Sequence, residues 1–92
     1  MSRYSIDFSV KAAKDFDKFR KSNPHLLRKV EKILKDIKMH PRTGLGHPEA
    51  LVGEGGDVYS RHVSGKNRIV YEICEEEMWV SIISLEGHYK DK

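Results

Sequence analysis

Residues 22–41, SNPHLLRKVEKILKDIKMHP, give the clearest secondary-structure signal in the chain. Asn23 can act as an N-cap, and Pro24 follows at the first helical position, where its missing N–H leaves no hydrogen bond unmade. Pro41 ends the pattern, because a proline cannot continue the helical hydrogen bonds. The apolar residues in between recur at helical spacing and form one stripe, made of Leu26, Leu27, Val30, Ile33, Leu34 and Ile37. The stretch therefore predicts an amphipathic helix with one buried face.

The outer face of this predicted helix is rich in basic residues, namely Arg28, Lys29, Lys32 and Lys35. Such a face is compatible with two interpretations, a solvated surface and a nucleic-acid-binding surface. Glu31 and Asp36 interrupt the run of positive charge, and this interruption favours the solvated surface.

The segment before this helix predicts a strand followed by a first helix. Residues 4–8 alternate apolar and polar side chains, as a half-buried strand does. Ser9 then stands at an N-cap position. The apolar side chains that follow at helical spacing are Val10, Ala13, Phe16 and Phe19, and we expect this face to pack inward. The helix should end near Lys21 and Ser22.

The second half of the chain begins with a long connecting segment, residues 42–57, RTGLGHPEALVGEGGD. Its five glycines and its proline predict a loop, and loops of this length in a small domain are usually functional or mobile. Three strand patterns follow, at residues 58–63, 67–74 and 78–85, and the last is the most apolar, which predicts a central strand. The short segments between them predict hairpin turns.

This order of elements predicts the α+β class: an N-terminal strand, two helices and then a three-strand antiparallel meander, with the helices packed on one face of the sheet. The 92 residues fit one domain, residues 1–92. The net charge of +3 permits a nucleic-acid or ribosome partner without requiring one. The single cysteine, Cys74, cannot form an internal disulfide, and no segment resembles a signal peptide or a membrane span. We therefore expect a cytoplasmic protein.

The side chains with the clearest chemical potential are Glu49 in the glycine-rich loop, Arg68 at a strand start, and His88 with Tyr89 after the last strand. Taken singly, each is an ordinary surface residue or strand end. Taken together, they are what RNA cleavage without a metal needs: a base for the ribose 2′-OH, a cation for the phosphate and an acid for the departing 5′-oxygen. The histidines lie at no metal-ligand spacing, so we expect neither a metal site nor a cofactor.

Four short motifs resemble the RelE/YoeB superfamily of bacterial toxins, and within it the Txe/YoeB branch. They are GLGHPEAL at residues 44–51, YSRHV at 59–63, NRIVYEI at 67–73 and GHY at 87–89. Each motif is weak alone, but all four occur in the order and the element pattern typical of the family. The resemblance covers nearly the whole chain.

The resemblance implies the toxin of a type II toxin–antitoxin system, a ribosome-dependent endoribonuclease that cuts mRNA in the ribosomal A site through a cyclic phosphate. It also implies the partners: the ribosome and mRNA, a YefM/Axe-like antitoxin whose acidic C-terminal segment folds onto the toxin, and a second copy in a homodimer. No membrane is involved.

The resemblance also assigns roles by motif. Glu49 would be the general base, Arg68 the cation that stabilises the phosphate, and His88 the general acid. Tyr89 would support the base or the phosphate being cut. The hairpin motif would add RNA contacts from the side chains of Tyr59, Arg61 and His62.

Three positions depart from the family pattern. His62 stands where a second arginine is usual, Val52 where a lysine is usual, and Tyr59 where a tryptophan is usual. The first two departures remove positive charge, so phosphate binding would be weaker or, through His62, dependent on pH. Two alternatives therefore stay open: a ParE-like toxin that inhibits DNA gyrase by binding, and a catalytically degenerate toxin that acts as a binding partner.

Overall fold

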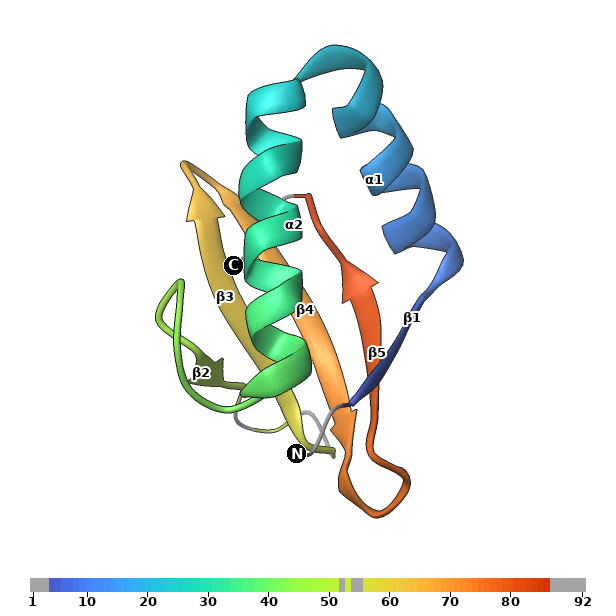
Figure 1. The fold of residues 1–92 in the computed structure, drawn as a ribbon, viewed down its shortest axis with the longest axis vertical. Coiled ribbons are helices and arrows are strands. Elements are labelled where there is room, and N and C mark those ends of the chain that lie inside the picture. The colour runs from blue at the N-terminus through green and yellow to red at the C-terminus, as the bar shows by residue number, and fades with distance from the viewer. Residues whose placement is uncertain (1–3, 52, 54–55, 87–92) are drawn as a thin grey trace.

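The computed structural model describes residues 4–51, 53 and 56–86, and within them the chain forms two α-helices and a five-stranded mixed sheet (Figure 1). The helices are α1 (Val10–Ser22) and α2 (Pro24–Met39). The strands are β1 (Ser5–Phe8), β2 (Glu49–Ala50), β3 (Val58–Ser64), β4 (Asn67–Cys74) and β5 (Trp79–Ser84), and a 3₁₀ turn, Glu75–Glu77, links β4 to β5. The predicted α+β class is confirmed.

Both helices begin at the capping residues that the sequence predicts. The Ser9 hydroxyl accepts a hydrogen bond from the Ala12 N–H at 3.0 Å, and the Asn23 side chain accepts one from the Leu26 N–H at 3.2 Å. Such bonds satisfy N–H groups that have no partner inside the helix, and each stabilises a helix start by about 1 kcal/mol. The Ser9 hydroxyl also donates to the Ile83 carbonyl at 2.7 Å, so the start of α1 is attached to β5.

The sheet has the strand order β1-β5-β4-β3-β2, with β1 parallel to β5 and the other described pairs antiparallel. A parallel pair needs a long crossover connection, and here the two helices and the strands β2, β3 and β4 lie between β1 and β5 along the chain. The predicted meander is thus confirmed, and β5 is an interior strand, although β4 is the middle one. The segment expected to be a continuous loop contains β2, which pairs with β3.

Both helices pack on one face of the sheet (Figure 1). In this view α2 crosses in front of β3 and β4, and α1 lies nearer to β5 and β1. The predicted apolar stripe of α2 faces the core. Alternate residues of β4 and β5 complete that core, namely Ile69, Tyr71, Ile73, Val80 and Ile82. We call the opposite face of the sheet, which the helices do not cover, the far face.

The buried face of α1 agrees with the predicted one only in part: Phe19 is buried and Phe16 packs against the core. Val10 and Ala13 are exposed, Val10 by 74%. The α1 side chains that are buried are Ala12, Asp15 and Phe19. The reason is the Asp15 carboxylate, which accepts hydrogen bonds from the backbone N–H groups of Leu85 (3.0 Å) and Glu86 (3.2 Å) just after β5. A polar residue therefore occupies an inward position that hydrophobic periodicity alone cannot identify.

Two glycines allow the loop after α2 to approach the rest of the protein closely. Gly44 (φ 117°) and Gly46 (φ 80°) both adopt the left-handed backbone region that favours glycine. A Cβ at Gly44 would overlap the Asp36 carboxylate, and a Cβ at Gly46 would lie 2.8 Å from the His62 carbonyl oxygen. The Gly-x-Gly spacing is therefore a packing requirement of the loop that leads into β2.

We expect Gly44→Ala to destabilise the protein more than Gly53→Ala does. Gly53 has a φ of 87°, but a Cβ there would meet no described atom within 4 Å, so its substitution adds only backbone strain of about 1–3 kcal/mol. Gly44→Ala adds the overlap with Asp36 to that strain. Urea unfolding of the two variants measures the difference in their free energies of unfolding. Equal losses would show that close packing does not constrain this loop.

Candidate active site on the far face of the sheet

Predicted site residues from three strands lie together on the far face. β2 pairs Glu49 with Ser60 of β3, and β4 pairs Arg68 with His62 of β3. Antiparallel partners point their side chains to the same side of a sheet, and residues two apart on one strand do the same. All four side chains therefore share one face. It is the far face, because Ile69, which follows Arg68, points the other way into the core beneath the helices.

The carboxylate of Glu49 and the guanidinium of Arg68 face each other across β3. Arg68 Nη1 lies 3.9 Å from Glu49 Oε1 and donates a long hydrogen bond of 3.5 Å to the Ser60 hydroxyl. The Glu49 side chain is 69% exposed and that of Arg68 31%, so water screens the pair, which contributes only about 0–1 kcal/mol to stability. A pair this weak leaves the guanidinium available for another anion.

Arg61, one residue along β3, points in the opposite direction and is fully buried, with 0% of its surface exposed. Its Nε donates to the Tyr71 hydroxyl at 3.0 Å, and its Nη1 donates to Asp36 Oδ2 at 2.6 Å. Its remaining N–H groups donate to the backbone carbonyls of His40, Thr43 (2.9 Å) and Leu45 (3.1 Å). The RNA contact predicted for Arg61 is therefore corrected to a structural role, because every N–H group is used inside the protein.

Tyr59 also lies on the helix side of the sheet and does not join the far-face residues. Its half-buried ring stacks on Tyr71, with ring centroids 6.1 Å apart and planes inclined by 23°. The Tyr71 hydroxyl in turn donates to the Pro41 carbonyl at 2.6 Å. Of the three residues predicted to contact RNA, the structure thus leaves the exposed His62 beside Glu49 and Arg68 and places Tyr59 and Arg61 on the opposite face.

The buried cluster around Arg61 changes the pKa of two of its members. Burial acts to raise the pKa of Asp36, but hydrogen bonds from Arg61 and from the Leu45 N–H outweigh it and hold that pKa below its usual range. Burial raises the pKa of the Tyr71 hydroxyl, and the Arg61 guanidinium offsets this only in part. At neutral pH the cluster therefore contains one cation, one carboxylate and one neutral phenol.

A second set of ion pairs holds the segment that carries Glu49 at its other end, near Asp57. Arg42 bridges Asp57 and Glu75, with its Nη1 2.8 Å from Glu75 Oε1. The Tyr4 hydroxyl donates to the same Glu75 carboxylate at 2.9 Å. The hydrogen bond from Arg42, followed by that from Tyr4, lowers the pKa of Glu75. The segment that carries Glu49 is therefore attached to the sheet at both of its ends.

Sequence reasoning did not identify the residues that position Glu49. Asp36 counted only as a break in the basic face of α2, and Arg42 was not considered. The available signal was the place of Asp36 in the last turn of its helix, where the helix dipole disfavours an acid. An acid at that position indicates a specific cationic partner, which the structure shows to be Arg61.

Several predictions concern residues that lie outside the described ones: His88 and Tyr89 after β5, and Val52 in the loop. Across residues 4–51, 53 and 56–86, no group of three His, Cys, Asp or Glu side chains is arranged to hold a metal ion. Neither described helix is long and apolar enough to cross a membrane.

Similar proteins match this chain over most of its length. Toxin YoeB from Mycobacterium bovis is 28% identical over 85 residues, which cover 92% of this chain and 98% of that protein. The chain in the structure of the YoeB dimer from Staphylococcus aureus is 29% identical, with a TM-score of 0.84 over 96% of this chain and 100% of that one. The toxin in a YoeB–YefM complex from Staphylococcus aureus is 30% identical, with the same coverage and a TM-score of 0.81.

The fold and these matches define the class of the protein as a small toxin of a bacterial toxin–antitoxin system. A family model described as "YoeB-like toxin of bacterial type II toxin-antitoxin system" matches residues 8–89. The chain therefore belongs to the YoeB-like family of type II toxins. The resemblance seen in the four sequence motifs is confirmed.

We expect Arg61→Met to lower the free energy of unfolding by about 3–5 kcal/mol, because it leaves the Asp36 carboxylate and several buried acceptors without their cationic donor. Arg68→Met is the matched control: it removes the same charge from a site with weak contacts and should change stability by about 0.5 kcal/mol or less. Urea unfolding followed by circular dichroism measures both. A loss for Arg61→Met as small as that of the control would contradict the structural role.

The lowered pKa of Asp36 predicts how stability depends on pH. A carboxyl group whose pKa is lower in the folded protein stabilises the fold above its unfolded pKa of about 3.9, and this contribution is lost as the pH falls through the folded pKa. Asp36→Asn should therefore be less stable than the wild type near neutral pH, and the difference should shrink as the solution is acidified below about pH 4. Urea unfolding at a series of pH values tests this, with the exposed Glu76→Gln as control. A difference independent of pH would refute it.

Proposed function

We propose that the protein is a ribosome-dependent endoribonuclease that cuts mRNA in the ribosomal A site, using side chains to catalyse attack by the ribose 2′-OH. The observation that carries this proposal is the approach of Glu49 and Arg68 to 3.9 Å on the far face. Glu49 and Arg68 come from separate segments of the chain and meet across β3. This supports their assignment as the base and the phosphate-binding cation of such a reaction. Membership of the YoeB-like family supports the same assignment.

In this reaction Glu49 removes the proton from the 2′-OH, and the 2′-oxygen forms a bond to the adjacent phosphorus. The bond from that phosphorus to the 5′-oxygen of the next nucleotide breaks, which leaves a 2′,3′-cyclic phosphate. His88 gives the departing 5′-oxygen its proton, and Tyr89 supports the base or phosphate at the cut. Arg68 balances the charge that builds on the phosphate oxygens, because a guanidinium stays charged and can bind two oxygens at once.

The exposure of the site favours a macromolecular substrate. Small-molecule enzymes usually bury most of their substrate in a concave pocket, whereas Glu49 projects from a sheet face with 69% of its side chain exposed. A strand of RNA held on the ribosome would lie against such a face, with the ribosome forming the opposite wall. The weak contact between Arg68 and Glu49 also helps, since the guanidinium can exchange that carboxylate for a phosphate at little loss of stability.

Two protein partners are part of the proposal. The Staphylococcus aureus relatives occur as a YoeB dimer and as a YoeB–YefM complex, and their identity to this chain supports a homodimer and a YefM/Axe-like antitoxin here. The net charge of +3 is complementary to an acidic antitoxin segment. Binding of that segment would neutralise the toxin.

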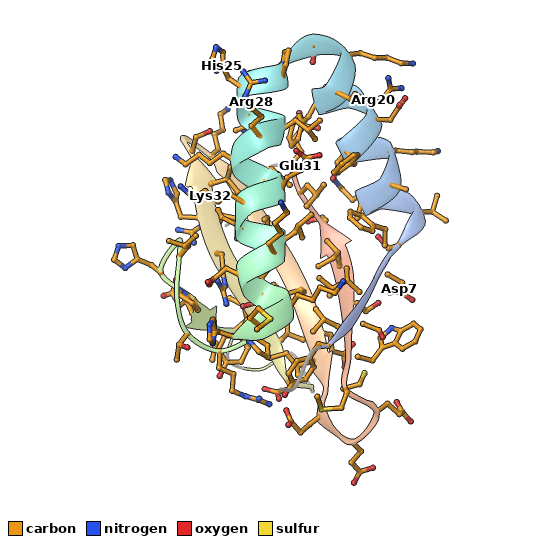
Figure 2. All side chains as sticks on the ribbon, viewed as in Figure 1. Asp7, Arg20, His25, Arg28, Glu31 and Lys32 are labelled. Atoms are coloured by element: carbon orange, nitrogen blue, oxygen red, sulfur yellow. The ribbon has the colours of Figure 1, made fainter. Side chains whose placement is uncertain are left out.

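We expect Glu49→Gln to reduce mRNA cleavage in a purified translation system by about 10²–10⁴-fold, which is the usual loss when a general base is removed. Asp7→Asn is the matched control, because it removes a carboxylate from the same face of the sheet at the opposite edge, β1 (Figure 2). The control should cleave at the wild-type rate, and both variants should keep the wild-type unfolding midpoint.

Other outcomes point to the alternatives. Growth arrest that persists in Glu49→Gln without mRNA cleavage would overturn the nuclease and favour a ParE-like inhibitor of gyrase. A wild-type protein that neither cleaves mRNA nor arrests growth, but still binds an antitoxin, would indicate a degenerate toxin. In either case the Glu49–Arg68 pair would be a surface ion pair without a catalytic role.

A further inference from the structure

A groove of about 310 Å³ runs between α2 and the outer part of β3. Lys29 and Lys32 of α2 form one wall, and the opposite wall includes His62, Val63 and Leu45. The two lysines are three residues apart, so their side chains are neighbours on one side of the helix. Figure 2 shows Lys32 on the side of α2 that lies nearer to β3. The groove therefore has basic residues on one wall and a histidine on the other.

Nothing in the described chain neutralises these two lysines. No described carboxylate lies within ion-pair distance of either, and the same is true of Lys35 and Lys38 further along α2. The acids that interrupt the basic run of α2 are directed elsewhere. Glu31 lies on the side of α2 nearer to α1 (Figure 2), and Asp36 is bound by Arg61. The acidic residues that interrupt the basic run in the sequence therefore lie away from this part of the helix.

His62 connects the groove to the candidate active site. It pairs in register with Arg68 across β3 and β4, and it also lines the groove with Lys29 and Lys32. The β2–β3 pairing covers Tyr59 and Ser60. Next to it, the His62 N–H donates to the Gly46 carbonyl at 2.7 Å, so the loop that leads into β2 borders the groove at His62. The far face with Arg68 and the groove with the lysines of α2 thus adjoin at His62.

We propose that this groove binds the sugar–phosphate backbone of the single-stranded RNA next to the nucleotides held at Glu49 and Arg68. Lys29 and Lys32 would each contact a phosphate, and the 43% exposed side chain of Leu45 would lie against a ribose or a base. The site rests on the proposed nuclease function for its purpose, but it makes a separate claim about binding.

An acidic peptide is the rival occupant of a basic groove. RNA is favoured because the groove adjoins, at His62, the face that carries Glu49 and Arg68, where a phosphate is expected. A peptide that merely covered the lysines would have no need of that adjoining face.

Two pairs of substitutions on one helix test the proposal. Lys29→Gln with Lys32→Gln removes two charges from the groove, and Lys35→Gln with Lys38→Gln removes two equally exposed charges from the other side of α2, near Ile6. Lysine and glutamine have similar helix propensities, so both variants should fold. The probe is a fluorescent single-stranded RNA of about 12 nucleotides, a length suited to one small binding surface, with every 2′-OH methylated so that it cannot be cut.

The measurement is RNA affinity by fluorescence anisotropy over a series of salt concentrations. The slope of log affinity against log salt is negative, and each lost phosphate contact should reduce its magnitude by about 0.7. The magnitude for the groove variant should therefore be smaller by about 1.4 than that for the wild type. The control variant should keep the wild-type slope. Equal losses in both variants would show a diffuse charge effect and overturn the proposal. A groove variant that binds RNA like the wild type but resists a co-expressed antitoxin would overturn it in favour of an acidic peptide.

This experiment separates the groove from the nuclease. The methylated RNA cannot be cleaved, so its binding is independent of catalysis. If the wild type does not cut mRNA during translation, but the groove variant shows the smaller salt dependence of RNA binding, the groove is upheld and the nuclease is rejected. If the wild type cuts mRNA normally, but the groove variant keeps the wild-type salt dependence of RNA binding, the nuclease is upheld and the groove is rejected.

Discussion

Hydrogen bonds from one buried guanidinium hold the loop between α2 and β2 against the sheet. A charge can be buried only where acceptors meet all of its donors, and Arg61 meets this condition with Asp36, Tyr71 and three backbone carbonyls of the loop. The backbone that carries these carbonyls turns at Gly44, which adopts a positive φ that favours glycine. β2 starts soon after, so this buried cation fixes the approach of the chain to Glu49, and Arg42 holds the other end of the segment.

The alternation of side chains along β3 separates the structural cation from the chemical one. Arg61 points beneath the helices, while its neighbours Ser60 and His62 point to the far face with Arg68. The two arginines carry the same guanidinium group, but Arg61 is buried and Arg68 is partly exposed. Every donor of Arg61 is used within the fold, whereas Arg68 has a long hydrogen bond and a 3.9 Å ion pair. The arginine that the fold does not require is the one available to a substrate.

Much of the fold was predictable because its signals are local. Ser9, Asn23 and Pro24 mark helix starts through contacts within a few residues, and the meander follows from short strand patterns. The meeting of Glu49 and Arg68 was predictable only through motif order. The burial of Arg61 was not predictable, because an arginine between a serine and a histidine has the pattern of an exposed strand. Its acceptors come from residues 36–45 and 71, and only the folded chain brings them together.

The parallel pairing of β1 with β5 has a consequence for the order in which a newly made chain can fold. The ribosome delivers β1 first and β5 last, yet residues 5–8 find their strand partners only in residues 79–82. Helix α1 packs on α2 but gains its remaining bonds at the same event, since Ser9 and Asp15 bond to Ile83, Leu85 and Glu86. The β3–β4 hairpin needs neither. During synthesis β1 therefore has no strand partner until the last strand emerges, and an incomplete chain would lack a docked β1 as well as its final strand.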